Sequence, residues 1–268
     1  MTRAADATFG SDTAVSDSVM PPYNRSIQPS GKGAIMRNQV TGRGGGSYRV
    51  VMERTLIDRL SAVSSTSLAD AAPALVVLPT SLRPVVPGRK FAGRAVTVRA
   101  ERDLMGAIAG LAAAEAGDVL VIDAGGDDRA VAGELFSTEA QRRGLAAFVV
   151  FGRCRDSAIL ATLDLPIYCT GFAPNAYAAQ AVPQVGVSLD LAGAGVEPGD
   201  LLMGDDDGIV CGSVEAMAAA IDKAEEIQAR EEGLQRAIAD GQSIFEHMNW
   251  DEHLAARTAG RPSALSLA

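Results

Sequence analysis

Apolar and polar positions follow a regular order along the chain from about residue 51. The stretches DVLVID at 118–123 and AAFVVF at 146–151 are short, continuous apolar runs, which are typical of strands buried on both faces. Between them, GELFSTEAQRRG at 133–144 has the amphipathic spacing of a helix and ends at a glycine. A strand, a helix and a second strand of these lengths predict a βαβ unit with parallel strands.

Further elements are expected on both sides of this unit. The pattern predicts helices at 53–62, just before Pro73, at 104–115, and at 214–239 with an interruption at Gly233. It predicts strands at 92–100, 166–169, 184–189, 200–203 and 209–211. The last two strands flank GDDDG, which we interpret as a hairpin turn and not as a metal site, because three adjacent carboxylates cannot all face one ion.

Composition divides the chain into three parts. Residues 1–50 are rich in Ser, Gly, Pro and Asp and lack periodicity, so we expect a poorly ordered N-terminal arm. Residues 51–213 form the expected α/β core, and residues 214–268 a C-terminal helical extension. A chain of 268 residues can bury one substantial core and still carry both extensions.

Charge and cysteine content exclude several classes of function. The net charge is −9 and the 24 Lys and Arg residues form no cluster, which argues against a nucleic-acid partner. The sequence has no membrane-spanning apolar run and no secretory signal, so we expect a cytoplasmic protein without a membrane partner. The three cysteines are widely spaced and lack a C-x-x-C motif, so they indicate neither a disulfide framework nor a thiolate zinc site.

The predicted βαβ unit brings acidic and basic residues to one edge of the sheet. Asp123 ends the first strand, Glu134 begins the helix, and Arg155 and Asp156 follow the second strand. Parallel strands end on the same edge, and open α/β sheets bind ligands there. The twenty residues between Glu134 and Arg155 are the length that a helix, a loop and a strand need to return to that edge.

This edge has the groups needed to bind a carboxylate and a cation. The helix starts at Gly133, and its first main-chain N–H groups, near Leu135 and Phe136, lack intrahelical acceptors and attract an anion such as a carboxylate. Arg155 can hold the same carboxylate through two parallel hydrogen bonds. The carboxylates of Asp156, Glu134 and Asp123 are candidate ligands for Mg²⁺ or Mn²⁺. A cation that chelates a 2-oxo acid would stabilise an enolate at its C3.

Simpler interpretations remain open. Arg-Asp pairs are common and usually form solvated ion pairs, and we interpret a second pair, Arg102-Asp103, as structural because it has no partner acid at βαβ spacing. Cys154 has no histidine near it in the sequence and is expected to be a small buried side chain.

The segment GDVLVIDAGG…AGELFSTEAQRRGLAAFVVFGRCRD resembles the family of 4-hydroxy-4-methyl-2-oxoglutarate (4-carboxy-4-hydroxy-2-oxoadipate) aldolases and the RraA regulators of ribonuclease activity. LRPVVPGRKFAGRAVTV and VEPGDLLMGDDDGIV are also similar to it, so the resemblance covers roughly residues 53–245. It implies an α/β/β/α sandwich of the swivelling-domain type, assembled as a homotrimer or homohexamer with sites at subunit interfaces.

The resemblance also implies roles for individual residues. Asp156 would hold a divalent metal largely through waters, Arg155 would bind the pyruvyl carboxylate, and main-chain amides near Leu135 and Phe136 would assist. Position 134 is Glu where the aldolases have Asp, which leaves its role open. An acid from the neighbouring subunit's C-terminal helix, here Glu231 or Glu232, would approach the metal waters.

We therefore expect a divalent-metal-dependent class II pyruvate aldolase, a carbon–carbon lyase that cleaves 4-hydroxy-2-oxo acids to pyruvate. Oxaloacetate decarboxylation is the expected side activity, because it passes through the same enolate. The alternative is a non-catalytic regulator that binds a ribonuclease or another protein through its surface.

Overall fold

The computed structural model describes residues 45–267. Most of the segment assigned to the N-terminal arm, residues 1–44, therefore lies outside the described residues, as does residue 268. The first helix, α1 (Gly45–Ala62), begins in the last part of the stretch 1–50 that was assigned to the arm, several residues before the predicted start at 53. None of the helices described between residues 45 and 267 is long and apolar enough to cross a membrane.

Ten of the described strands form one sheet with the order β1-β12-β11-β3-β4-β6-β7-β2, in which β5 also pairs with β6, and β8 with β3. Their bounds are β1 (Val76–Val77), β2 (Arg83–Pro84), β3 (Phe91–Arg99), β4 (Asp118–Asp123), β5 (Ala130–Ala132), β6 (Ala147–Cys154), β7 (Ile167–Phe172), β8 (Gln184–Val185), β11 (Leu201–Gly204) and β12 (Ile209–Gly212). A separate antiparallel pair consists of β9 (Leu189–Leu191) and β10 (Ala194–Val196).

The central strands β3, β4, β6 and β7 are parallel neighbours, as the apolar runs predict for the pair β4 and β6. Helix α4 (Glu134–Arg142) connects β4 to β6, which confirms the βαβ unit. The sequence pattern missed β5, which lies between β4 and α4. A three-residue strand is too short to show a period of two, and its pairing with the end of β6 extends β6 from the predicted 151 to Cys154.

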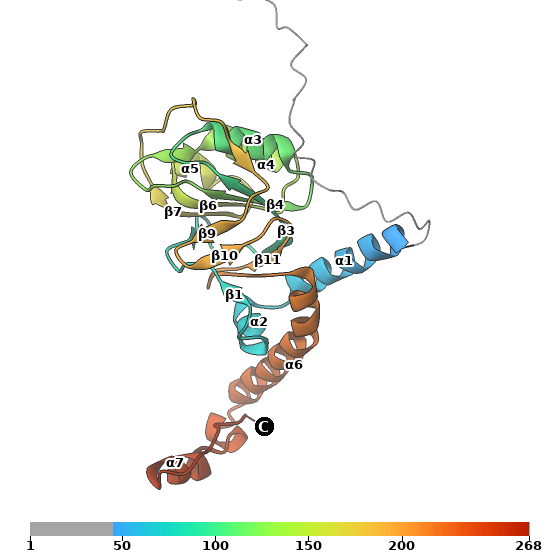
Figure 1. Ribbon diagram of the computed structural model, residues 1–268. Coiled ribbons are helices and arrows are strands. Elements are labelled where there is room, and N and C mark those ends of the chain that lie inside the picture. Colours follow the sequence, from blue (N-terminus) through green and yellow to red (C-terminus); the bar gives the residue numbers. More distant parts are fainter. Residues whose placement is uncertain (1–44, 268) are drawn as a thin grey trace, which may run out of the picture. The chain divides into compact units, whose positions relative to one another are not determined.

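Helices cover both outer faces of the curled sheet (Figure 1). On one face α3 (Met105–Ala113), α4 and α5 (Ser157–Leu160) pack against β4 and β6. On the other, α1, α2 (Ser65–Ala71) and α6 (Val214–Ala239) pack against β11 and β12. A third apolar cluster fills the inside of the curl, where the rings of Phe91 and Tyr168 pack edge to face with their centroids 5.4 Å apart. The predicted α/β sandwich is confirmed.

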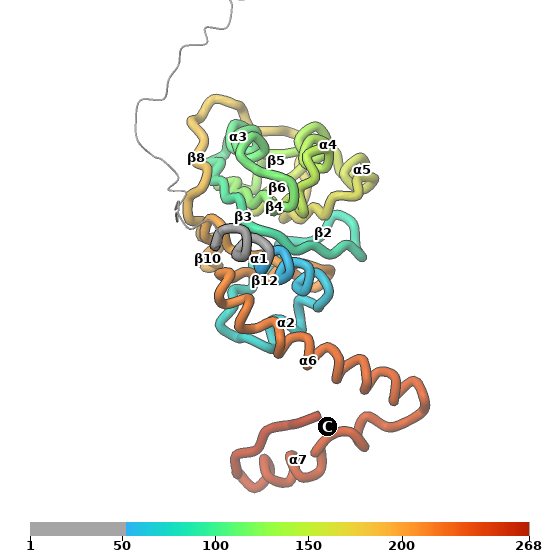
Figure 2. Tube along the Cα trace, turned by 90° about the vertical axis from the view of Figure 1, so that its right-hand side faces the viewer, coloured from blue at the N-terminus to red at the C-terminus, as the bar shows by residue number. Residues whose placement is uncertain are grey.

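The C-terminal extension begins with α6 and continues through η1 (Ile244–His247) and α7 (Trp250–Thr258), which Figure 2 shows from the side. The predicted interruption at Gly233 was wrong, because α6 runs unbroken from 214 to 239. A single glycine costs a helix only about 1 kcal/mol, and the Glu, Leu, Gln and Arg residues around it favour helix.

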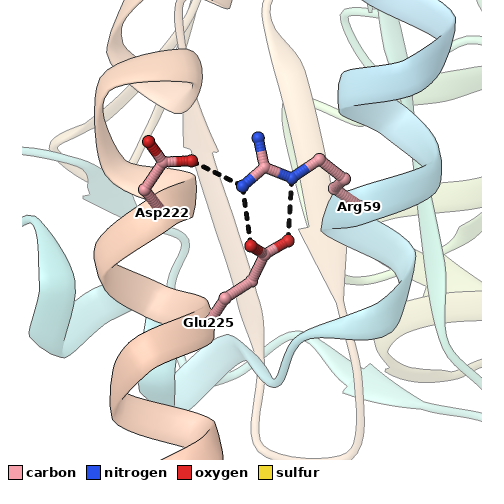
Figure 3. Close-up of polar contacts among 3 residues, drawn as sticks. All are labelled: Arg59, Asp222 and Glu225. Carbon is pink, nitrogen blue, oxygen red and sulfur yellow. Dashed lines mark hydrogen bonds and ion pairs between the residues drawn. The ribbon is translucent and has the colours of Figure 1, made fainter.

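An arginine fork joins α1 to α6 (Figure 3). Arg59 donates from Nε and Nη2 to the two carboxylate oxygens of Glu225, at 2.8 and 2.7 Å, and from Nη2 to Asp222 at 2.5 Å. The hydrogen bond from Arg59 lowers the pKa of Glu225. The first half of the extension is thus fixed to the core, whose buried residues include Met217 and Ile221.

The GDDDG segment is the predicted hairpin turn between the antiparallel strands β11 and β12. Its carboxylates bond to separate partners: Asp205 accepts from the main-chain N and Oγ of Ser65, and Asp206 accepts from Gly88 N. These bonds fix the turn to the start of α2 and to the loop before β3.

Candidate active site

The pairing of β5 with β6 places the predicted site residues side by side. Ala132 of β5 lies opposite Cys154 of β6, and its carbonyl accepts from Arg155 N at 3.0 Å. Helix α4 starts two residues after Ala132, while Arg155 and Asp156 follow β6 directly. Glu134 and Asp156, 22 positions apart, therefore meet at one edge of the sheet, as the spacing predicts.

Asp156 has a left-handed backbone, with a φ of 61°, which Asp tolerates better than most residues. Its Oδ2 accepts from Glu134 N at 3.1 Å and lies 3.4 Å from Arg155 Nε. The carboxylate thus stands at the positive end of α4, where negative charge is stabilised. The next N–H groups of this first turn, at Leu135 and Phe136, have no intrahelical acceptor and can receive a second anion.

Glycine is required at position 133 for lack of space and not for its backbone conformation. Its backbone is extended, which suits any residue. A Cβ on Gly133 would lie 2.4 Å from Asp156 Oδ2 and 2.7 Å from Arg155 Cγ. The absence of a side chain therefore allows both functional groups to pack directly against the start of α4. A glycine immediately before a helix was the only sequence signal of this close approach.

Two adjoining pockets share Glu134 and Arg155. The smaller, of about 50 Å³, is lined by Leu104, Ala132, Gly133, Glu134, Leu135, Phe136 and Arg155. The larger, of about 570 Å³, is lined by Glu134, Arg155, Asp156, Ser157, Ala158, Ile159, Phe172, Ala173 and Pro174. The side chain of Arg155 is 43% exposed, and within the described part of the chain its ion pair is with Asp156. Its guanidinium can therefore reach a ligand.

Asp123, the third predicted metal ligand, lies apart from the other two. Its Oδ1 accepts from Gly125 N at 2.9 Å, and it lines neither pocket. Among residues 45–267 no group of three or more His, Cys, Asp or Glu side chains could hold a metal. The pair Glu134 and Asp156 still fits Mg²⁺, which commonly binds one or two carboxylates and keeps several waters, for which the open pocket has room.

The second Arg-Asp pair is structural, as expected. Asp103 is buried and accepts from the N–H groups of Met105, Gln180 and Ala181 at 2.7–3.0 Å. Burial alone would raise the pKa of Asp103, but these three donors together lower it. Its neighbour Arg102 pairs with Asp128 at 2.9 Å.

The loop after β7 is hydrogen-bonded to β5 beside the site, a contact that the sequence did not indicate. Asn175 O accepts from Ala130 N at 2.9 Å, and Tyr177 N donates to Ala130 O at 3.0 Å, so the loop braces β5. Ala178 O accepts from the N–H of Leu104, a residue that lines the smaller pocket. Cys154 is fully buried beneath this edge, as predicted.

Comparisons with known proteins agree with this arrangement. A protein of Halalkalibacterium halodurans named "Putative 4-hydroxy-4-methyl-2-oxoglutarate aldolase" is 33% identical over 190 residues, 70% of this chain and 90% of that protein. The solved structure of Streptomyces coelicolor RraAS2, an unusual member of the RNase ES inhibitor RraA family, is 30% identical, with a TM-score of 0.60 over 68% of this chain and 96% of that one.

The structure of the RNA-processing inhibitor RraA from Thermus thermophilis is 32% identical, with a TM-score of 0.51 over 55% of this chain and 90% of that one. The family described as RraA-like, Aldolase/RraA, matches residues 65–211, which include every residue of both pockets. This chain therefore belongs to the RraA-like (Aldolase/RraA) family.

Proposed function

We propose that this protein is a divalent-metal-dependent lyase that cleaves 4-hydroxy-2-oxo acids to pyruvate and a second carbonyl compound, and that it also decarboxylates oxaloacetate. One observation carries the proposal. The half-exposed side chain of Arg155, the Leu135 and Phe136 amides that lack intrahelical acceptors, and the carboxylates of Glu134 and Asp156 share one rim. The aldolase name of the H. halodurans relative supports the same reaction class.

Arg155 and the start of α4 bind and orient the pyruvyl group. The planar guanidinium forms two parallel hydrogen bonds to the substrate carboxylate, and the Leu135 and Phe136 amides donate to the same end of the molecule. The wall of the smaller pocket, which includes Leu104 and Ala132, excludes water from one side of this carboxylate. The C3–C4 bond then points into the larger pocket.

Asp156 and Glu134 are the residues that would hold Mg²⁺ or Mn²⁺. Bound there, the cation supplies positive charge that stabilises the developing pyruvate enolate. Asp156 is held in place beforehand by the N–H of residue 134 and by Arg155, so its carboxylate needs little reorganisation.

The two reactions break the same bond. In aldol cleavage the C4 hydroxyl gives its proton to water in the solvent-open pocket as the C3–C4 bond breaks. The electron pair remains on the pyruvyl fragment as an enolate, which takes a proton from water at C3 to become pyruvate. In oxaloacetate decarboxylation the C4 carboxylate leaves as CO₂, and no hydroxyl proton has to be removed. The decarboxylation therefore tests the binding of the pyruvyl group without requiring the natural aldol substrate.

We also propose that the protein forms a homotrimer or homohexamer. Leu135 beside the site is 71% exposed, and Phe245 and Leu254 in the C-terminal extension are 61% and 47% exposed. Apolar surface of this kind is commonly covered by a partner. Light scattering at micromolar concentration measures the assembly, and a fully active monomer would contradict a shared site.

A regulatory function is the second candidate, because two of the similar structures are of RraA proteins named as inhibitors of RNA processing or of a ribonuclease. The deciding assay follows loss of oxaloacetate and release of pyruvate with Mg²⁺, with Mn²⁺ and after EDTA. The enzyme must exceed the background of the metal alone. Activity no higher than this background would favour the regulator.

A further inference from the structure

The turn after β3 has an unusual backbone. Glu101 and Arg102 are both left-handed, with φ of 50° and 66°, and neither is a glycine. Such conformations are costly for residues with a side chain and persist where the surrounding contacts require them. Hydrogen bonds from Arg102 N to Ala124 O at 2.7 Å and from Asp103 N to Ala100 O at 3.1 Å fix the turn. It places the buried carboxylate of Asp103 at the edge of the sheet where β4 and β6 also end.

Asp103 joins two segments that line the site. Its Oδ1 accepts from Met105 N at 2.8 Å, at the start of α3. Its Oδ2 accepts from Gln180 N and Ala181 N at 2.7 and 3.0 Å, in the loop after β7. The chain enters that loop through residues 172–174, which line the larger pocket. All of these bonds lie within one chain, so a trimer or hexamer would keep them.

Leu104 is the residue through which this network reaches the smaller pocket. It lies between Asp103 and Met105 in the chain, and its own N–H donates to Ala178 O at 2.8 Å. Leu104 lines the smaller pocket together with Arg155, and in the proposed function this wall excludes water from one side of the substrate carboxylate. Asp103 itself lines neither pocket. The position of the wall therefore depends on a carboxylate behind it.

Within the proposed function, on which this inference rests, we infer that Asp103 is a positioning residue of the active site, which acts through Leu104 to keep the pocket for the pyruvyl carboxylate closed to water. Asp103 does not touch the substrate. The wall that it holds faces the carboxylate and not the C3–C4 bond that breaks. Loss of Asp103 should therefore weaken binding of the pyruvyl group more than it slows bond cleavage.

Asp103→Asn keeps the size of the side chain but replaces one acceptor with an NH₂ group that faces an N–H donor. Calorimetry with pyruvate and Mg²⁺, at a temperature where wild type and variants are all folded, measures the effect on binding. The Kd should rise about tenfold, the scale of one hydrogen bond to a charged group. For oxaloacetate, KM should rise while kcat changes much less.

Asp205→Asn is the matched control. Asp205 is 7% exposed, against 6% for Asp103, and it also accepts three hydrogen bonds, from Ser65 N, Ser65 Oγ and Asp207 N. It lines neither pocket of the site, so the Kd of pyruvate should not change. A double mutant tests the route. Leu104→Ala alone should weaken pyruvate binding, and Asp103→Asn should add little to that loss, because both remove the same wall.

Two kinds of failure can be distinguished. If Asp103→Asn binds pyruvate as tightly as wild type, loses no more affinity than Asp205→Asn, or adds its full effect to that of Leu104→Ala, the inference is overturned and the pyruvyl site stands. If Asp103→Asn does not fold, Ala181→Pro removes one donor from the same carboxylate and takes its place in each comparison. If wild type neither binds pyruvate nor consumes oxaloacetate, the proposed function and the inference fail together.

Discussion

Replacing Gly133 with alanine should inactivate the site while leaving the fold intact. The added Cβ would stand 2.4 Å from Asp156 Oδ2, about 1 Å short of an ordinary contact, and 2.7 Å from Arg155 Cγ. Relief of either contact moves a functional group by about that distance. A displacement of this size in a positioned group costs on the order of a hundredfold in rate.

Stability should change little, because the backbone at Gly133 is extended and accepts alanine. The more restricted unfolded chain contributes about 0.4–1 kcal/mol of stabilisation, which offsets part of the local strain. The expected result is therefore a fall of about a hundredfold in kcat/KM for oxaloacetate, with a shift in melting temperature of no more than about 4 °C.

Initial rates with saturating Mg²⁺ and a thermal melt of the same preparation measure both quantities. Gly195→Ala is the matched control, since a Cβ at Gly195 meets nothing within 4 Å. Unchanged activity in Gly133→Ala would show that Asp156 and Arg155 do not act from the positions described. Equal losses in both variants would show that the effect is unrelated to the clash.

Three further predictions concern charged groups. Arg155→Lys keeps the charge but loses the fork, so kcat/KM should fall by about a hundredfold or more, while Arg102→Lys should have almost no effect. Arg59→Ala breaks a partly exposed fork to α6, which should lower stability by about 1 kcal/mol, or roughly 2–4 °C in melting temperature, and less in high salt; an unchanged melt would contradict this. The fold lowers the pKa of Asp103 below its ordinary value of 3.8, so the ionised carboxylate stabilises the folded state at pH values above 3.8. Asp103→Asn should therefore melt below wild type at pH 7, and the gap should close as acid protonates the wild-type carboxylate; a constant gap would refute the linkage.

The periodicity predicted the central fold because each long element repeats one signal several times. The buried runs of β4 and β6 and the amphipathic face of α4 are such elements, and their lengths were enough to predict that Glu134 and Asp156 share one edge, where the pairing of β5 with β6 then places them side by side. Asp123 also ends its strand at that edge, but a position on an edge does not fix the direction of a side chain. Its carboxylate turns to the nearby Gly125 N–H, a local bond that strand counting does not detect.

Other parts of the site depend on contacts between segments distant in sequence. The brace from Asn175 and Tyr177 onto Ala130 joins residues more than forty positions apart, and neither segment has a periodic pattern that would indicate it. The close approach at Gly133 depends on where Asp156 points after a left-handed turn, which composition does not specify. Long-range contacts of this kind explain why the edge was predictable and its detailed geometry was not.

The hydrogen bond that holds Asp156 has a consequence for which sequences this site tolerates. Its donor is the main-chain N–H of residue 134, and every amino acid except proline supplies that group. The side chain at 134 can therefore change without releasing Asp156, and the Glu found here leaves this anchor intact. Proline is the one replacement that removes the donor. The geometry of Asp156 should therefore tolerate many different side chains at position 134, even where the change alters metal or substrate binding.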